Sequence, residues 1–435
     1  MKKMAADPHC DHVRPNGLAR ELPLYLARLG LGLGLVMLVG AGASPAAETT
    51  KPQLIMFSID DGVTAEMAEY TAKLPVPWTF FVSFIDGSNA STPEERNKLR
   101  AWQCVDSTGK KNATAGNPCI AEPDLILKKY NEGNEIALHT YTHYHLVQKD
   151  KEYKDVIFPE EITEELTLNL QNLTNSKVPA SAIRGFRAPY TEDQVQGRDS
   201  IPSRDEALTA LQKFFNLHGI IYESSFSEMR GAPSNPADPS PRQGLRVCGE
   251  TKESYNLKWC DIHNKSDFDW PTYGYPKYAT ADDPEKSWHI LMNKAWTPPE
   301  HTTPVAASMD QAWTYCFNDC NNAKQVQDFW MFHFLNHYNN DRTPFGVHIH
   351  LRSLHGDNKD SEFQLQGMID FVKEVQSKYP DAYFVTGGEI IDYAKLATKP
   401  TTMAEWDKIF YETRYWKLHT RPAHVTMKSA KKSAK

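Results

Sequence analysis

The chain has 435 residues, 40% of them hydrophobic and 24% charged, so it can bury the core of one large domain or of two ordinary ones. Its formal net charge of −7 gives no electrostatic reason to bind nucleic acid, and we expect no such partner. The last residues, 428–435, read KSAKKSAK, a composition that cannot bury apolar surface. We therefore predict a basic, disordered tail there.

An apolar run over residues 29–43 follows three arginines near the N-terminus. It is short and glycine-rich for a membrane span, which needs about 20 apolar residues, and small residues follow it as at a signal cleavage site. The pattern favours a signal peptide within residues 1–47 and hence a secreted, extracellular protein. An uncleaved signal-anchor over 22–43 is the alternative, and it would hold the chain at a membrane, facing the outside.

Six of the seven cysteines follow the apolar run, and an even number in a secretory context predicts disulfides. Connectivity cannot be read from spacing, but the simplest pairing joins the nearest partners, Cys104/Cys119, Cys248/Cys260 and Cys316/Cys320. No Cys-x2-Cys pair occurs, which argues against zinc bound by thiolates. Four sequons would be glycosylation acceptors in an exported protein, namely Asn89, Asn112, Asn172 and Asn264.

Strands and helices alternate after this N-terminal region. Residues 53–59 and 78–85 are continuous apolar runs, as in strands that a parallel sheet buries on both faces. A helical pattern at 123–130 stops at Gly133. There follow a strand at 135–139, a helix at 160–173, a strand at 183–186, a helix at 204–217 and a strand at 220–221.

Residues 225–304 interrupt the alternation and are rich in Pro, Gly, Asp and Trp, which we interpret as long loops on the same domain. The alternation then resumes with a helix at 324–338, a strand at 345–350, a helix at 362–379, a strand at 382–386 and a helix at 388–395. This order predicts an α/β fold with a parallel, barrel-like sheet. We place this domain at 48–400 and a C-terminal extension at 401–435.

Asp60 and Asp61 end the first predicted strand, at the edge where a parallel sheet collects reactive groups. Adjacent carboxylates repel unless a cation offsets them. A capping pair at a strand–helix turn is the simpler interpretation of this dipeptide alone.

His139 and His143 follow the third strand with a four-residue spacing that metal sites commonly use. The motif is weak by itself, because His145 shows that histidines are frequent in this stretch. With an acidic pair at another strand end, however, it supplies two imidazoles and a carboxylate with open positions. That arrangement suits a catalytic zinc ion and a water.

Arg187 follows the strand at 183–186 and could pair with an aspartate and keep it ionised, although a surface arginine at a proline turn is the simpler interpretation. His348 and His350 share one face of their strand, so spacing cannot choose between them, and a buried structural histidine is the usual alternative for either. Each signal is weak singly. Their order at successive strand ends makes the set specific.

This ordered set resembles the polysaccharide deacetylases of carbohydrate esterase family 4, the NodB-like domains. Their first motif, Thr-Phe-Asp-Asp-Gly, corresponds to residues 58–62, Ser-Ile-Asp-Asp-Gly. His-(Ser/Thr)-x-x-His corresponds to 139–143, Arg-x-Pro-Tyr to 187–190, and the strand that carries the catalytic histidine to the one ending at His350. Residues 78–83, 184–190, 334–337 and 383–386 are similar to stretches of arthropod chitin deacetylases, and the resemblance covers 52–395.

The resemblance implies a distorted (β/α) barrel with long loop insertions, open on one side to a polymer chain. Asp60 would be the general base with Arg187 as its charge partner. The backbone N–H of Tyr190 would help stabilise the oxyanion, and His350 would be the general acid. The implied metal ligands are Asp61, His139 and His143.

The implied activity is metal-dependent hydrolysis of an amide bond, which removes the N-acetyl group of N-acetylglucosamine units in chitin or a related glycan. The implied cofactor is a divalent metal ion, and zinc is the leading candidate. Two alternatives stay open: a deacetylase of another N-acetylated glycan such as peptidoglycan, and a non-catalytic glycan-binding matrix protein that keeps the fold. The presence of the whole set of six polar residues argues against the second alternative.

The chain also departs from the family pattern. The fourth motif, normally an Asp and a Trp beside the catalytic histidine, is not clear, and its candidates are Asp269-Trp270 and Trp288. After His350 the chain reads Leu-Arg-Ser-Leu-His, so we expect a different substrate groove. No cysteine-rich chitin-binding module is visible.

Overall fold

The computed structural model describes residues 51–422 apart from 88–89, 91, 113, 115, 147, 150–154, 157–158, 190–203, 226, 229–271, 274–287, 290–291, 297–305, 309–319, 340–341, 352–353 and 355–361. The predicted signal segment, the basic tail, Tyr190 and the pair Asp269-Trp270 therefore lie outside the described residues. The chain divides into two units, Met1–Glu48 and Thr49–Lys435, and everything below concerns the second.

A sheet of nine strands forms the centre of this unit among the residues that the structure describes. Eight of them run in the order β13-β1-β2-β3-β6-β7-β10-β9, and β14 also pairs with β1. Every pairing is parallel except that between β10 and β9, as the (β/α) barrel class predicts. The strands are β1 (Gln53–Asp61), β2 (Trp78–Val82), β3 (Glu135–Leu138), β6 (Gly185–Phe186), β7 (Tyr222–Glu223), β9 (Thr272–Tyr273), β10 (Trp288–His289), β13 (Phe345–Ile349) and β14 (Ala382–Phe384).

Strand β1 organises the sheet. Ile55 pairs with both Phe345 of β13 and Phe384 of β14, so these two strands lie along opposite edges of β1. Phe57 pairs with β13 and β2, so β2 shares an edge with β14. The first eight residues of β1 are buried, as expected for a strand with neighbours on both edges and layers on both faces.

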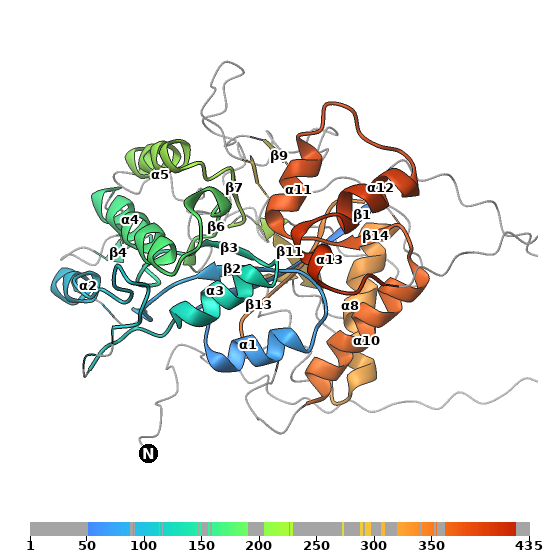
Figure 1. Ribbon diagram of the computed structural model, residues 1–435, viewed down its shortest axis with the longest axis horizontal. Helices are drawn as coiled ribbons and strands as arrows, with labels where there is room; N and C mark the ends of the chain where they lie inside the picture. The colour runs from blue at the N-terminus through green and yellow to red at the C-terminus, as the bar shows by residue number, and fades with distance from the viewer. Residues whose placement is uncertain are drawn as a thin grey trace, which may run out of the picture. The chain divides into compact units, whose positions relative to one another are not determined.

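Helices connect the strands (Figure 1). In that view α8 and α10 pack side by side, and so do α4 and α5. None of the described helices is both long and apolar enough to cross a membrane. The helices are α1 (Ala65–Ala72), α2 (Pro93–Arg100), α3 (Pro123–Asn131), α4 (Pro159–Asn175), α5 (Arg204–His218), α8 (Ala323–Tyr338), α10 (Phe363–Lys378), α11 (Gly387–Ala394), α12 (Met403–Tyr411) and α13 (Arg414–Leu418), with a 3₁₀ turn at Ala180–Ala182.

Short strands occupy two places where the sequence predicted none. The pair β4 (Gln148–Lys149) and β5 (Asp155–Val156) precedes α4. A three-stranded sheet of β8 (Ser227–Glu228), β11 (Met292–Trp296) and β12 (Ala306–Ser308) begins in the stretch that we interpreted as long loops. Trp288, a candidate for the fourth motif, lies in β10 of the main sheet.

Side-chain caps fix where several helices begin. The side chains of Thr92, Thr386 and Thr402 each accept a hydrogen bond from the backbone N–H of a glutamate three residues on, and the carboxylate of that glutamate accepts one from the backbone N–H of the threonine. Such reciprocal boxes satisfy the free N–H groups of a first turn. The box at Thr386 begins α11 right after β14, which explains the sharp strand-to-helix turn there.

The core continues beyond residue 400. Trp406, Phe410, Tyr415 and Trp416 of α12 and α13 are buried in the same apolar cluster as the sheet. The indole N–H of Trp416 donates to the backbone carbonyl of Phe384 in β14. The first part of the predicted C-terminal extension thus packs on the domain rather than leaving it.

Two predictions about covalent modification, the disulfides and the glycosylation sites, can be compared with the structure. A disulfide joins Cys104 and Cys119, which confirms that pair, and Cys320 is also disulfide-bonded, although Cys316 lies outside the described residues. The sequon at Asn172 was wrong as a glycan acceptor. Its side chain is 2% exposed in α4, accepts a hydrogen bond from the Val105 backbone and donates to a carbonyl of its own helix.

Candidate active site

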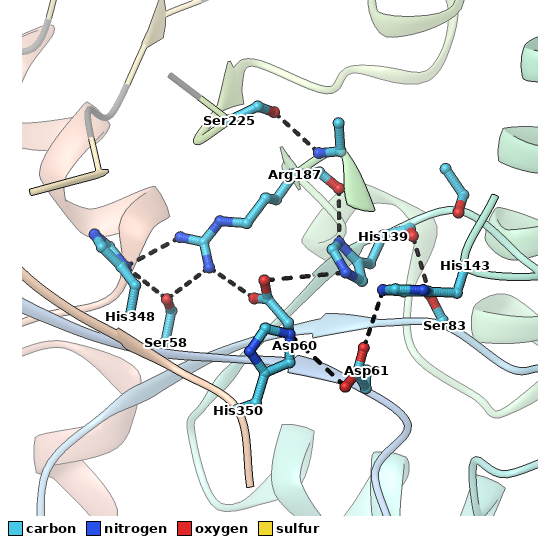
Figure 2. Close-up of polar contacts among 12 residues, drawn as sticks. Ser58, Asp60, Asp61, Ser83, His139, His143, Arg187, Ser225, His348 and His350 are labelled. Carbon is cyan, nitrogen blue, oxygen red and sulfur yellow. Dashed lines mark hydrogen bonds and ion pairs between the residues drawn. The ribbon is translucent and has the colours of Figure 1, made fainter. Parts of the chain in front are cut away.

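The predicted site residues gather at the C-terminal edge of the sheet (Figure 2). Ser58 and Asp60 lie two residues apart on β1, so their side chains share a face, and Ser58 is the register partner of His348 on β13. Asp61 ends β1 with a positive φ of 81°, which turns its side chain out of the alternation of the strand. The adjacent aspartates therefore face different partners.

Asp60 faces Arg187. Its Oδ1 lies 2.7 Å from Nη1 of Arg187, and Asp60 is only 4% exposed while Arg187 is fully buried. The guanidinium also lies over the ring of Phe81, 4.1 Å from its centroid. A charge-assisted hydrogen bond from arginine stabilises a carboxylate, and a carboxylate is the form of the side chain that acts as a general base.

Asp61 faces the histidines. Its Oδ1 lies 3.2 Å from Nε2 of His143, and its Oδ2 lies 3.8 Å from Nε2 of His350. One donor atom each from Asp61, His139 and His143 lies within 4.8 Å of the other two. Asp61 is the most exposed of the three, and His350 is also partly exposed, so this side of the cluster faces the surface.

His139 shows why a metal ion fits here. Its Nδ1–H donates to the backbone carbonyl of Arg187 at 2.8 Å, because a carbonyl can only accept. This bond leaves a lone pair on Nε2, which is buried, lies 3.9 Å from Oδ2 of Asp60 and has no hydrogen-bond partner among the described residues. Metal-binding histidines typically hold their tautomer in this way. Burial lowers the pKa of both His139 and His143, which favours the neutral form that binds metals.

The backbone around the donors is in a rare conformation. Thr140 and His143 have φ values of 64° and 53°, in the left-handed region that residues other than glycine seldom adopt. The side chain of Thr140 accepts the N–H of Tyr144, and its carbonyl accepts from Asn169 of α4. Strain of this kind persists only where surrounding contacts enforce it, and it clusters at functional sites.

Glu165 holds the same loop and was not predicted from the sequence. Its two carboxylate oxygens accept the N–H and the hydroxyl of Thr142, at 2.8 and 2.7 Å. Glu165 is fully buried, and burial raises its pKa to about 7 despite those hydrogen bonds and Arg100 nearby. It lies on α4, where a glutamate in a helical pattern gives no signal of this role.

A second support comes from the disulfide loop. The hydroxyl of Tyr141, between the two histidines, donates to the carbonyl of Trp102 and accepts from the N–H of Cys104. The Cys104–Cys119 bond closes this loop, and Ile120 and Ala121 at its end pack on Gly62, next to Asp61. A Cβ at Gly62 would collide with the side chain of Ile120.

His348 lies on β13 and His350 directly follows the strand, which ends at Ile349, and the two histidines have different surroundings. His350 reaches Asp61 at the partly exposed side of the site, whereas His348 is buried and contacts Ser58 and Arg187. The structure thus brings together all the predicted residues that it describes. They are Asp60, Asp61, His139, His143, Arg187 and His350.

Comparison with known proteins gives one match to a family. Residues 47–200 match the model of the family described as polysaccharide deacetylase. This stretch contains the two aspartates, both metal-site histidines and Arg187. No curated protein matches the chain.

Several solved structures are similar in part. The family 4 carbohydrate esterase from Streptomyces lividans, in complex with acetate, is 15% identical over 40% of this chain and 64% of its own, with a TM-score of 0.23. The peptidoglycan deacetylase PdaC from Bacillus subtilis is 11% identical over 83% of this chain and 96% of its own, with a TM-score of 0.30.

A third similar structure is the Xyl-CE4 domain of a multidomain xylanase from the hindgut metagenome of Trinervitermes trinervoides. It is 13% identical over 80% of this chain and 95% of its own, with a TM-score of 0.28. All three TM-scores are low, so these structures carry no argument about this chain.

Proposed function

We propose that this chain is a polysaccharide deacetylase, as the match over residues 47–200 supports, and that it removes the acetyl group from N-acetylglucosamine units of chitin. One observation carries the proposal. An aspartate ion-paired to a buried arginine, Asp60, directly precedes the carboxylate of a three-donor metal centre, and a partly exposed histidine, His350, faces the same centre. Amide hydrolysis needs a base, an electrophilic centre and a proton donor, and these groups can supply them.

Each residue of the site has its own role in the proposed reaction. A divalent cation held by Asp61, His139 and His143, which we propose to be zinc, would polarise the acetyl carbonyl and acidify a water. Asp60 accepts the proton of the attacking water, and Arg187 is the charge partner of Asp60. His350 then gives a proton to the departing amine, so that acetate and a free glucosamine amine result.

Chitin as the substrate is supported by the similarity of four stretches, among them 78–83 and 383–386, to arthropod chitin deacetylases. We also propose that the protein is exported, which the apolar run at 29–43 and the disulfide Cys104–Cys119 support. Peptidoglycan, the substrate class in the name of the similar Bacillus subtilis protein, is the second candidate substrate.

The test is acetate release from chitin oligomers, colloidal chitin and peptidoglycan by the purified chain loaded with zinc. The proposal predicts release from chitin oligomers and its loss in Asp60→Asn, which keeps the volume of the side chain and removes the base. Release from peptidoglycan alone would move the substrate to the second candidate. No release from any of the three, with glycan binding retained, would favour the non-catalytic alternative.

A further inference from the structure

His348, on β13, is 2% exposed, whereas His350, which directly follows β13, is partly exposed. Its Nδ1 lies 2.7 Å from Oγ of Ser58 and 3.0 Å from Nη2 of Arg187. Figure 2 shows its ring facing the guanidinium, on the side away from His139 and His143. The sequence assigned no part to His348, and the mechanism above does not use it.

The guanidinium of Arg187 has five N–H donors, and each of them has an acceptor. Nε donates to the carbonyl of Ser224, and Nη1 donates to Ser58 and to Asp60. Nη2 donates to the hydroxyl of Ser224 and to Nδ1 of His348. Because the guanidinium is planar and rigid, acceptors on Nε and Nη2 fix the direction in which Nη1 points, which is toward Asp60.

His348 must be neutral to take this part. Arginine can only donate, so Nδ1 of His348 presents its lone pair and the proton is on Nε2. Burial, and after it the charge of Arg187, lower the pKa of His348 well below its usual range. The strand also makes room for the ring, because a Cβ at Gly346 would collide with it.

The other ring nitrogen of His348 makes no such contact within the described part of the chain. Nε2 of His348 is buried without a hydrogen-bond partner among the described residues. An unsatisfied buried donor costs about 1–3 kcal/mol. An aliphatic or phenyl side chain would avoid that cost but would leave an N–H of the buried Arg187 without this acceptor, so what the imidazole adds at this position is the acceptor on Nδ1.

We propose that His348 is a positioning residue, which holds the guanidinium of Arg187 in the orientation that meets the base Asp60. The consequence for turnover rests on the proposed function. The hydrogen bond from Arg187 to His348 can be tested in the protein without a substrate.

Two substitutions separate the acceptor from the volume. His348→Asn places a carbonyl oxygen close to where Nδ1 stands but removes volume, whereas His348→Phe keeps the volume and has no acceptor. We expect kcat of His348→Phe to fall by about 100-fold, the effect of misplacing a catalytic group by about 1 Å, with KM and metal content unchanged. His348→Asn should keep more activity than His348→Phe, although it removes more of the side-chain volume.

Val347→Ala is the matched control, because Val347 is a buried neighbour on the opposite face of β13. It should lose stability and keep the kcat of the wild type. If packing were the role of His348, the order would reverse and the phenylalanine variant would be the more active one. That order would overturn the proposal.

Nitrogen-15 NMR of the wild-type protein gives an independent test. Nδ1 of His348 should be an unprotonated acceptor and Nε2 should carry the proton, with no titration between about pH 5 and 8, where an ordinary histidine changes its charge. The opposite tautomer would overturn the inference, whatever the kinetics show. A wild-type protein that releases no acetate would instead refute the proposed function and the effect on turnover, while the NMR result would still decide the contact with Arg187.

Discussion

Methionine at position 187 would keep most of the length of the arginine side chain and remove its charge and its donors. Arg187 is fully buried and Asp60 is 4% exposed, so water cannot replace the lost partner without opening the core. Removal of one member of a buried ion pair costs about 3–5 kcal/mol, because the other charge stays buried and uncompensated. Against a typical domain stability of about 5–15 kcal/mol, Arg187→Met should be folded but marginal.

A double-mutant cycle with Asp60→Asn measures this coupling by urea unfolding. Asp60→Asn alone should cost less than Arg187→Met, because the guanidinium keeps Ser58, Ser224 and His348 as acceptors. In the double variant no carboxylate is left unpaired, so its cost should be smaller than the sum of the single costs by about 1–3 kcal/mol. Costs that add within about 0.5 kcal/mol would refute the claim that the pair acts as a unit. Arg187→Lys, which keeps the charge and loses the rigid fork, should lie between the wild type and Arg187→Met.

Three further predictions concern the acid, the metal-site loop and the effect of pH on folding. His350→Asn should lower kcat sharply and remove the fall of activity at alkaline pH, with metal content unchanged; a profile like that of the wild type would assign the acid elsewhere. Glu165→Ala should weaken zinc binding by about 10–100-fold, measured by competition with a chelating dye, and Glu165→Gln should restore most of it, because Gln can still accept one hydrogen bond from Thr142. Equal losses in both variants would mean that the charge of Glu165, and not its contact with the loop, matters. Burial raises the pKa of Glu389 to about 7 in the folded protein, so the folded state binds more protons than the unfolded state between about pH 4.5 and 7. The stability that Glu389 contributes is therefore lost as pH rises, and wild type relative to Glu389→Gln should lose up to about 1.4 kcal/mol per pH unit across this range; a constant difference between the two unfolding free energies would contradict this.

The strands could be predicted because a strand that is buried on both faces has a continuous apolar run in its sequence, as in residues 53–59 of β1. The residues of the candidate site could be predicted from the sequence for a related reason. Parallel strands end at one edge, so Asp60, His139 and Arg187 could be expected to meet although they are far apart in the chain. The family resemblance then ordered roles that spacing left open, such as the choice of His350.

The residues that hold the site residues in place could not be predicted from the sequence. His348 reaches Ser58 across 290 positions of sequence, and only the register of β13 on β1 brings them together. Glu165 is one of several acidic residues on α4, and its burial depends on how that helix packs on the loop. The sequon at Asn172 failed for the same reason, because a three-residue motif carries no information on which face of α4 turns inward. The helices beyond residue 400 follow the last predicted strand, so no strand–helix alternation marked them as part of the core.

The most direct test of the account is the metal dependence of acetate release from chitin oligomers. The wild-type protein should lose activity when a chelator removes its metal and regain it with one equivalent of zinc. His143→Ala, which removes one of the three donors, should stay folded, bind no stoichiometric zinc and stay inactive after zinc is added. Full activity in the protein from which a chelator has removed the metal, or stoichiometric zinc in His143→Ala, would contradict the proposed centre of Asp61, His139 and His143.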